Sequence, residues 1–216
     1  MLDPKPRRGH IVLDGGGRPA VRSALRAGMA TNAAKRMTAK TGTRNIILTG
    51  FMATGKSSVG RGLAVRLGYD FVDLDSLIEA EAGMPVPQIF TTRGEAAFRE
   101  LEARMVEHAA GRTDCVIATG GGAIVNPRNL EALKRSGIVI TLTANPEIIL
   151  SRIGSEEDRP MLRGGEKRER IRLLLQERAP AYARADLTVD TSDRTVDEVV
   201  DLLADVLARY RVSAAE

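Results

Sequence analysis

The chain has 216 residues, 43% of them hydrophobic and 28% charged, so we expect one globular domain with a substantial core rather than a disordered or fibrous chain. The single cysteine, Cys115, excludes a disulfide framework and a zinc site built from several cysteines, and it indicates a reducing cytoplasm. No apolar run suits a membrane span or a signal peptide, and 3% aromatic residues without Trp argue against nucleic-acid binding by base stacking.

The first 43 residues differ in composition from the rest of the chain. Residues 1–44 carry ten Lys or Arg against two Asp, whereas the remainder carries 22 basic and 26 acidic residues. Three consecutive glycines and few large apolar side chains predict a basic, disordered extension over 1–43, followed by a single domain over 44–216. The positive charge of the extension is compatible with a contact to nucleic acid, whereas we expect no nucleic-acid binding by the domain.

Beyond the extension, apolar runs alternate with helical patterns. Strands are predicted at 45–50, 69–75, 115–122, 138–144 and 186–191. Helices are predicted at 56–67, 76–82, 95–110, 126–137, 146–153, 167–183 and 195–210. This alternation predicts an α/β fold with a five-stranded parallel sheet covered by helices on both faces. A charged, glycine-bearing segment at about 154–165 has the composition expected of a mobile lid.

Residues 50–60, GFMATGKSSVG, fit the pattern G-x-x-x-x-G-K-[ST] between a predicted strand and a predicted helix. The backbone N–H groups of such a loop can surround phosphate oxygens, and the start of the following helix favours an anion. Lys56 can reach the β- and γ-phosphates, and the hydroxyl of Ser57 can coordinate Mg²⁺. The loop therefore predicts a site for a nucleoside triphosphate.

Many folds share this loop, so the phosphate acceptor must be inferred from other motifs. The sequence contains neither the guanine-reading N-K-x-D of GTPases nor the Ser-Gly-Gly-Gln signature of transporter ATPases. Small phosphotransferases remain, including kinases for gluconate or nucleoside monophosphates. A nucleotide-binding regulatory module is the alternative from a different class of protein.

Four further features are candidates for the acceptor site. Asp73 and Asp75 in FVDLDSLIE would share a face of a strand and could serve a metal and an acceptor hydroxyl, although one Asp could instead cap a helix. Arg99 in GEAAFRELE lies within reach of Glu95 and Glu102, so a plain ion pair is its alternative role.

The other two features are a run of glycines and a pair of arginines. The glycines of IATGGGAI end a predicted strand, which is where open α/β sheets bind ligands, although a flexible turn would also use them. Arg159 lies in the predicted lid segment, and Arg178 lies near the end of a predicted helix. A planar guanidinium suits a carboxylate, but either arginine alone could be a solvated surface charge.

Taken together, these motifs resemble the shikimate kinase family. The segments GFMATGKSSVG, FVDLDSLIE, GEAAFRELE, IATGGGAI, RPML and ERAPAYARAD occur in the order and spacing of that family over roughly residues 44–211. The resemblance implies a fold like that of nucleoside-monophosphate kinases. It also implies ATP as co-substrate, Mg²⁺ as cofactor, and transfer of the γ-phosphate to the 3-hydroxyl of shikimate in aromatic amino-acid biosynthesis. We expect a cytoplasmic monomer without membrane contact.

The resemblance also implies a role for each matching residue. Residues implied to bind ATP are Gly50, Ala53, Thr54, Gly55, Lys56, Ser57, Ser58, Arg152, Arg159 and Arg194. Residues implied to bind the acceptor are Asp75, Arg99, Gly120, Gly121, Gly122 and Arg178.

Within these sets, Asp75, Lys56 and Arg159 are implied to be catalytic, with Asp75 as the candidate base. Arg99 and Arg178 are implied to clamp the shikimate carboxylate. Ser57 is implied to bind Mg²⁺ directly, and Asp73 through water. The phosphate loop departs from the family at Ala53–Thr54, where Gly-Ala or Gly-Ser is frequent, and at Ser58, where Thr is frequent.

Overall fold

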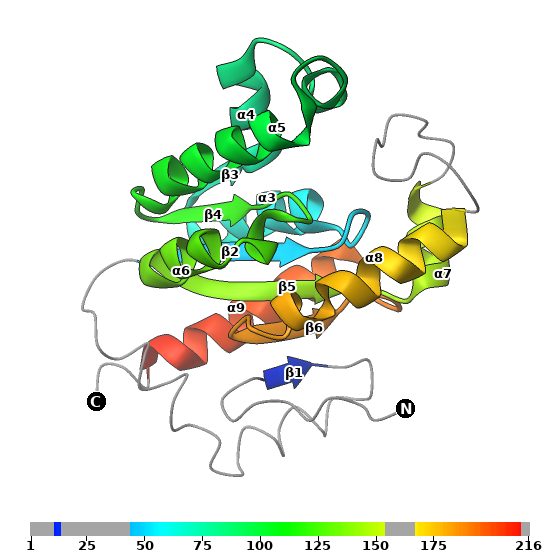
Figure 1. Cartoon of the computed structure of the whole chain (residues 1–216). Coiled ribbons are helices and arrows are strands. Elements are labelled where there is room, and N and C mark those ends of the chain that lie inside the picture. The colour runs from blue at the N-terminus through cyan, green and yellow to red at the C-terminus, as the bar shows by residue number, and fades with distance from the viewer. Residues whose placement is uncertain (1–10, 14–43, 154–166, 213–216) are drawn as a thin grey trace.

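A parallel β-sheet forms the centre of the molecule. The computed structural model describes residues 11–13, 44–153 and 167–212. The strands lie in the order β1-β6-β5-β2-β4-β3, and all neighbouring pairs are parallel (Figure 1). Their bounds are β1 Ile11–Leu13, β2 Asn45–Gly50, β3 Asp70–Asp73, β4 Cys115–Ala118, β5 Gly137–Thr143 and β6 Leu187–Asp190.

The five predicted strands are confirmed as β2 to β6, and β1 is an addition. β1 comes from the extension that composition predicted to be disordered, and it pairs with β6 so that Ile11 lies opposite Leu187. A parallel neighbour can pair there because β6 would otherwise form the edge of the sheet. The rest of the predicted extension, 1–10 and 14–43, lies outside the described residues, as does the predicted lid at 154–165.

Helices connect the strands, as the alternation of patterns predicted. Their bounds are α3 Lys56–Leu67, α4 Leu74–Ala82, α5 Val86–Ala110, α6 Pro127–Ser136, α7 Pro146–Ile153, α8 Lys167–Tyr182 and α9 Val196–Val212, with a short 3₁₀ helix η1 at Ala123–Val125. Several ends follow the local sequence. Asn126 caps α6 by accepting a hydrogen bond from the N–H of Arg128, and Pro127 suits its first turn.

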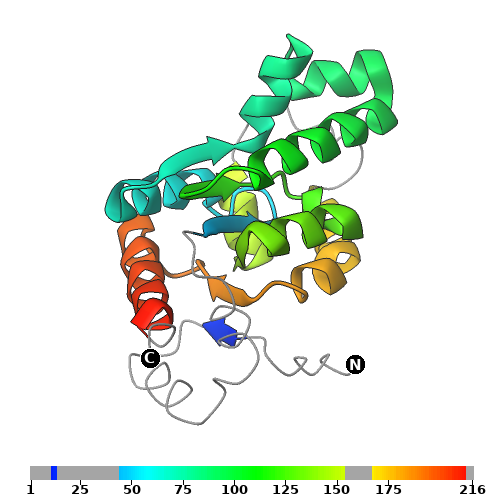
Figure 2. The ribbon, with the colours of Figure 1, turned by 90° about the vertical axis from the view of Figure 1, so that its left-hand side faces the viewer.

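The helices cover both faces of the sheet. α3 and α9 lie on one face, where Ile46, Leu48, Leu63 and Leu203 belong to one buried cluster. Figure 2 shows these two helices on one side of the sheet and α6 and α8 on the other. The second cluster joins Ile47 and Ile117 to the side chains of α6, α7 and α8. Both faces of β2 are thus buried, which accounts for its uninterrupted apolar run.

Several predictions were wrong in their bounds, including the strand predicted over 115–122, which ends at Ala118. The strand predicted over 69–75 ends at Asp73, because the Asp73 carboxylate accepts a hydrogen bond from the N–H of Asp75 and caps α4. Asp75 therefore lies in the first turn of a helix, not on the same strand face as Asp73. The helix predicted from residue 95 begins at Val86, and Gly94 interrupts it with φ 81° and ψ 171°.

The loops after β2, β3 and β4 gather at the carboxyl edge of the sheet. The phosphate loop and two of the four acceptor motifs, FVDLDSLIE and IATGGGAI, therefore lie at these strand ends. α4 and the first part of α5 lie beyond β3, at the top of Figure 1, where Ile78, Ile89, Phe98 and Leu101 form a small separate core. Among the described residues, the helices are too short or too polar to cross a lipid bilayer.

Candidate active site

The phosphate loop spans the gap between β2 and α3 and has the geometry that its glycine motif predicts. Gly50 has φ 134°, and a Cβ there would overlap the carbonyl oxygen of Leu142 on β5. The first glycine of the motif is therefore required by the close approach of β5 as well as by the turn. The hydroxyl of Thr54 donates to the carbonyl of Phe51 at 2.8 Å, closing the loop on itself.

Lys56 is the first residue of α3, and its side chain folds back over the loop. Its Nζ donates to the carbonyl of Phe51 at 2.8 Å. The ammonium group is therefore held beside the loop rather than extended into solvent. The start of α3 adds backbone N–H groups and a favourable helix dipole for a phosphate.

Ser57 and Asp73 bring a hydroxyl and a carboxylate together beside the loop. The Ser57 Oγ donates to Oδ2 of Asp73 at 2.9 Å, and both side chains come from the carboxyl edge of the sheet. Mg²⁺ prefers oxygen ligands and keeps several of its waters, so this pair fits a site with one direct ligand and one ligand through water. The capping of α4 by the other carboxylate oxygen fixes Asp73 in this position.

One side of the loop faces a cavity of about 430 Å³, which we call the nucleotide cavity. The cavity is lined by residues of the loop, α3, α7 and the start of α9, including Ala53, Thr54, Gly55, Ser58, Arg152 and Arg194. Arg152 donates to the hydroxyl of Thr191 at 3.1 Å and to its carbonyl at 2.8 Å. The structure therefore brings the two distant arginines to the loop, as expected for a nucleotide site, while Arg159 lies outside the described residues.

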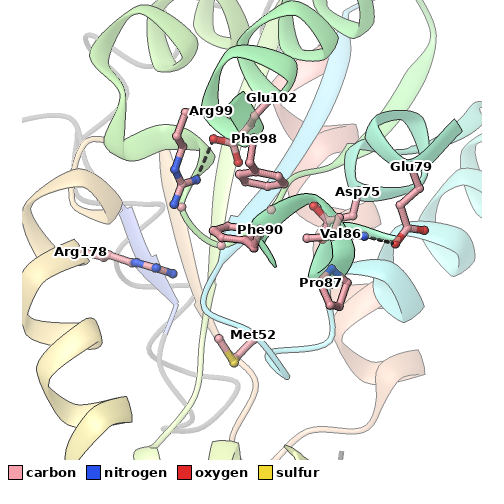
Figure 3. A pocket seen from close by; sticks show the side chains of 13 residues that line it. Met52, Asp75, Glu79, Val86, Pro87, Phe90, Phe98, Arg99, Glu102 and Arg178 are labelled. Atoms are coloured by element: carbon pink, nitrogen blue, oxygen red, sulfur yellow. Dashed lines mark hydrogen bonds and ion pairs between the residues drawn. The ribbon is translucent and has the colours of Figure 1, made fainter. Parts of the chain in front are cut away.

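The opposite side of the loop faces a second cavity, of about 270 Å³. Figure 3 shows Arg99 and Arg178 entering it from different helices, with Asp75 across from them. All six predicted acceptor residues line it: Asp75, Arg99, Gly120, Gly121, Gly122 and Arg178. The volume is near the lower limit for sites that bind small molecules, so this second cavity suits a small polar acceptor. We call it the acceptor cavity.

Arg99 is held by two carboxylates of its own helix, as the ion-pair alternative predicted. Its guanidinium lies 3.1 Å from Glu95 and 2.9 Å from Glu102. Burial opposes its charge, but the two ion pairs outweigh burial and raise the pKa of Arg99. Burial also raises the pKa of the Glu102 carboxyl, and the Arg99 guanidinium limits that rise. These pairs orient the guanidinium, which still lines the cavity.

The three consecutive glycines allow the side chains of the acceptor cavity to approach the backbone. A Cβ at Gly122 would lie 2.9 Å from Nη1 of Arg99, and a Cβ at Gly121 would lie 3.3 Å from Nη1 of Arg178. A Cβ at Gly120 would lie 3.0 Å from Oδ1 of Asp75. Each glycine therefore makes room for a different side chain of the acceptor cavity. A turn that used glycine only for its flexibility would not require these three close approaches.

Sequence reasoning missed the apolar wall of the acceptor cavity and one of its carboxylates. Phe90, Phe98, Met52 and Pro87 line the cavity, and so does Glu79. The aromatic pair was hidden because Phe90 and Phe98 lie on opposite sides of the break at Gly94, with ring centroids 4.6 Å apart. Glu79 lies one helical turn after Asp75 on α4, and the prediction of a strand over 69–75 hid this spacing.

The two cavities share one wall, because Met52 lines the acceptor cavity and Ala53 lines the nucleotide cavity. A parallel α/β sheet, a phosphate-binding loop and an acceptor cavity on the other side of that loop define a small-molecule kinase of the P-loop class.

The comparisons with known proteins give the family within this class. The family model described as shikimate kinase matches residues 52–208. Shikimate kinase from Thermoanaerobacter pseudethanolicus is 49% identical over 158 residues, which is 73% of this chain and 92% of that protein. Shikimate kinase from Geobacter sulfurreducens is 45% identical over 168 residues, which is 78% of this chain and 93% of that protein.

A solved structure of a family member is also similar to this chain. The structure of shikimate kinase from Acinetobacter baumannii in complex with shikimate gives a TM-score of 0.75 at 34% identity. The match covers 82% of this chain and 97% of that one. The chain belongs to the shikimate kinase family, which confirms the resemblance seen in its motifs and sets aside gluconate and nucleoside-monophosphate kinases.

Proposed function

We propose that this protein transfers the γ-phosphoryl group of ATP to the 3-hydroxyl of shikimate, giving ADP and 3-phosphoshikimate. The observation that carries the proposal is the shared wall between the two cavities, with Met52 on one side and Ala53 on the other. A donor phosphate held by the loop and an acceptor hydroxyl in the second cavity would face each other across that wall. Such positioning is the main source of rate in phosphoryl transfer.

On the donor side, the loop amides and Lys56 bind the phosphates, and Arg152 and Arg194 lie beside the nucleoside. Ser57 and Asp73 would hold Mg²⁺, which supplies positive charge to neutralise the phosphate oxygens when bound. Arg159 is proposed to contribute a further positive charge through its match to the family motif.

On the acceptor side, Arg99 and Arg178 bind the carboxylate of shikimate from two different helices. Two guanidinium groups in one small cavity select an acid over a neutral sugar or polyol, since only a carboxylate offers negative charge to both of them. The backbone of Gly121, between Gly120 and Gly122, binds a ring hydroxyl. Asp75 orients the 3-hydroxyl and accepts its proton as the bond to phosphorus forms.

One chain supplies all the side chains named for both substrates, so a monomer is sufficient for the reaction. We place the enzyme in the cytoplasm because its single cysteine is not suited to a disulfide-stabilised secreted protein. Sedimentation of the purified protein, with and without both substrates, tests the monomer.

The function is tested by ADP production from ATP with shikimate, gluconate or AMP as acceptor. We expect turnover with shikimate alone, and comparable turnover with another acceptor would contradict the proposal. Replacement of Asp75 by Asn should lower kcat about a hundredfold or more without changing the unfolding temperature, because a proton acceptor is lost. The matched control is Asp70→Asn, at the opposite end of β3, which should leave kcat unchanged.

A further inference from the structure

Tyr182 links the end of α8 to the glycine turn below the acceptor cavity. Its phenol donates a hydrogen bond to the carbonyl oxygen of Gly121 at 2.6 Å, across 61 residues of sequence. Tyr182 lies four residues after Arg178, so both side chains leave the same face of α8. The tyrosine does not line the cavity, yet it contacts a residue that does.

Tyr182 and Arg178 are both withdrawn from water, with 7% and 5% of their surfaces exposed. Burial raises the pKa of Tyr182 to about 12, while the neighbouring Arg178 guanidinium acts to lower it. The phenol therefore stays protonated at neutral pH and can act as a donor. A buried hydrogen bond of this kind is costly to lose because the carbonyl would remain unpaired.

The hydrogen bond also sets the direction of one peptide group in the glycine turn. The carbonyl of Gly121 and the N–H of Gly122 belong to the same planar peptide and point to opposite sides. Fixing the carbonyl toward Tyr182 therefore turns the N–H of Gly122 away from it. Glycine residues have little intrinsic preference for one orientation, so an external contact is needed to hold this peptide.

The end of α8 is itself anchored to the sheet. The hydroxyl of Thr141 on β5 donates to the carbonyl of Tyr182 at 3.2 Å. A Cβ at Gly121 would lie 3.3 Å from Nη1 of Arg178, so the guanidinium packs directly on the peptide that Tyr182 holds. The phenol, the turn and the guanidinium thus form one connected unit.

We propose that Tyr182 is a positioning residue of the acceptor site, holding the Gly121 peptide and the Arg178 guanidinium in the arrangement that binds the acceptor carboxylate and hydroxyl. This inference rests on the proposed function, because the acceptor is taken to be shikimate. Tyr182 does not touch the acceptor; it acts through two residues that do.

The test is Tyr182→Phe, which removes one oxygen atom and keeps the ring. We expect the KM for shikimate to rise about tenfold, corresponding to one lost hydrogen bond with its partner left unpaired, while the KM for ATP stays within about twofold. Calorimetric titration with shikimate should show the same loss of affinity. The matched control, Tyr69→Phe, removes a phenol oxygen near the other face of the sheet and should leave both KM values unchanged.

Coupling between Tyr182 and Arg178 is measured by adding Tyr182→Phe to an Arg178→Ala variant. We expect the second substitution to raise the KM for shikimate by less than about threefold, because the part of its effect that acts on the guanidinium is lost and only the part that acts on the Gly121 peptide remains. A full tenfold rise in that background would overturn the coupling. An unchanged KM for shikimate in Tyr182→Phe, or an equal rise in both KM values with a lower unfolding temperature, would overturn the positioning role.

The two proposals fail in different ways. If the unmodified protein neither binds nor phosphorylates shikimate, the proposed function is wrong. If it does both and Tyr182→Phe behaves like the unmodified protein, only the inference about Tyr182 is wrong.

Discussion

Arg99 and Glu102 form an ion pair whose acidic partner is almost fully withdrawn from water. Nη1 of Arg99 lies 2.9 Å from Oε2 of Glu102, and the exposed fractions of the two side chains are 34% and 2%. Burial raises the pKa of the Glu102 carboxyl, and Arg99 offsets part of this cost. The arginine therefore has two separable roles: it stabilises a buried carboxylate, and it is proposed to bind the acceptor.

Removal of Arg99 should lower stability in a pH-dependent way. We expect Arg99→Ala to reduce the free energy of unfolding by about 2 kcal/mol at pH 8, since it removes the closest partner of the buried Glu102 carboxylate. The loss is smaller than for a fully buried ion pair because Arg99 itself is partly exposed. An acid whose folded pKa is raised loses stability as pH rises through that pKa, so the reduction should be smaller at pH 5.

A second substitution separates the two roles of Arg99. Arg99→Ala combined with Glu102→Gln should recover most of the lost stability, because no buried carboxylate is then left without its partner. It should not recover shikimate binding, while ATP binding persists in both variants. Urea unfolding and calorimetric titration check the two effects, and recovery of shikimate affinity would argue against a direct role for Arg99.

Asp73 combines helix capping with the proposed metal contact, and Asp73→Asn distinguishes them. Asn caps helices as well as Asp does, so the unfolding temperature should change little. The loss of negative charge should raise the Mg²⁺ concentration for half-maximal activity about tenfold or more. Asp73→Ala is the contrast, since it should also lose about 1 kcal/mol of stability. An unchanged Mg²⁺ requirement in Asp73→Asn would remove Asp73 from the metal site.

Ala53 occupies a backbone conformation that favours glycine. Its φ is 60°, in the phosphate loop at the position where the family often has glycine. The left-handed conformation costs about 1–2 kcal/mol for a residue with a Cβ, and a glycine would avoid this cost. Part of the gain is lost because glycine has more conformational freedom in the unfolded chain. We expect Ala53→Gly to raise the free energy of unfolding by about 1 kcal/mol, measured by urea unfolding.

The control for this prediction has the opposite sign. Ala80→Gly, on the exposed surface of α4, should lower the free energy of unfolding by about 0.5–1 kcal/mol, because glycine is unfavourable within a helix. If Ala53→Gly is destabilising to a similar extent, the strain assigned to Ala53 is absent.

Gly122 leaves room for the guanidinium of Arg99, so Gly122→Ala should disturb the acceptor site specifically. The new Cβ would lie 2.9 Å from Nη1 of Arg99, and the end of this flexible side chain can move away. The protein should therefore fold, while the KM for shikimate rises about tenfold and the KM for ATP does not, as steady-state kinetics would measure. Gly111→Ala, with φ −73° and its nearest neighbour at 3.5 Å, should change neither value.

Most of the fold was predictable because its signals are local. The apolar runs of β2 and β5 and the cap before α6 mark their elements within a few residues. The bounds of β3 and α5 were not predictable with the same accuracy. β3 ends early because the Asp73 carboxylate caps α4, so the residues after it are helical. α5 is interrupted at Gly94, so its sequence does not show one continuous helical pattern.

The sequence by itself determined the phosphate loop, its Lys56 and Ser57, and the alternation that gives a parallel sheet. These features depend on residues close together in the chain, where spacing alone fixes geometry. Only the tertiary structure decided that Arg99, Asp75 and Arg178 face one cavity, and that Tyr182 holds the glycine turn beneath it. Such contacts join segments far apart in the chain, and they form only when burial of both sheet faces brings those segments together.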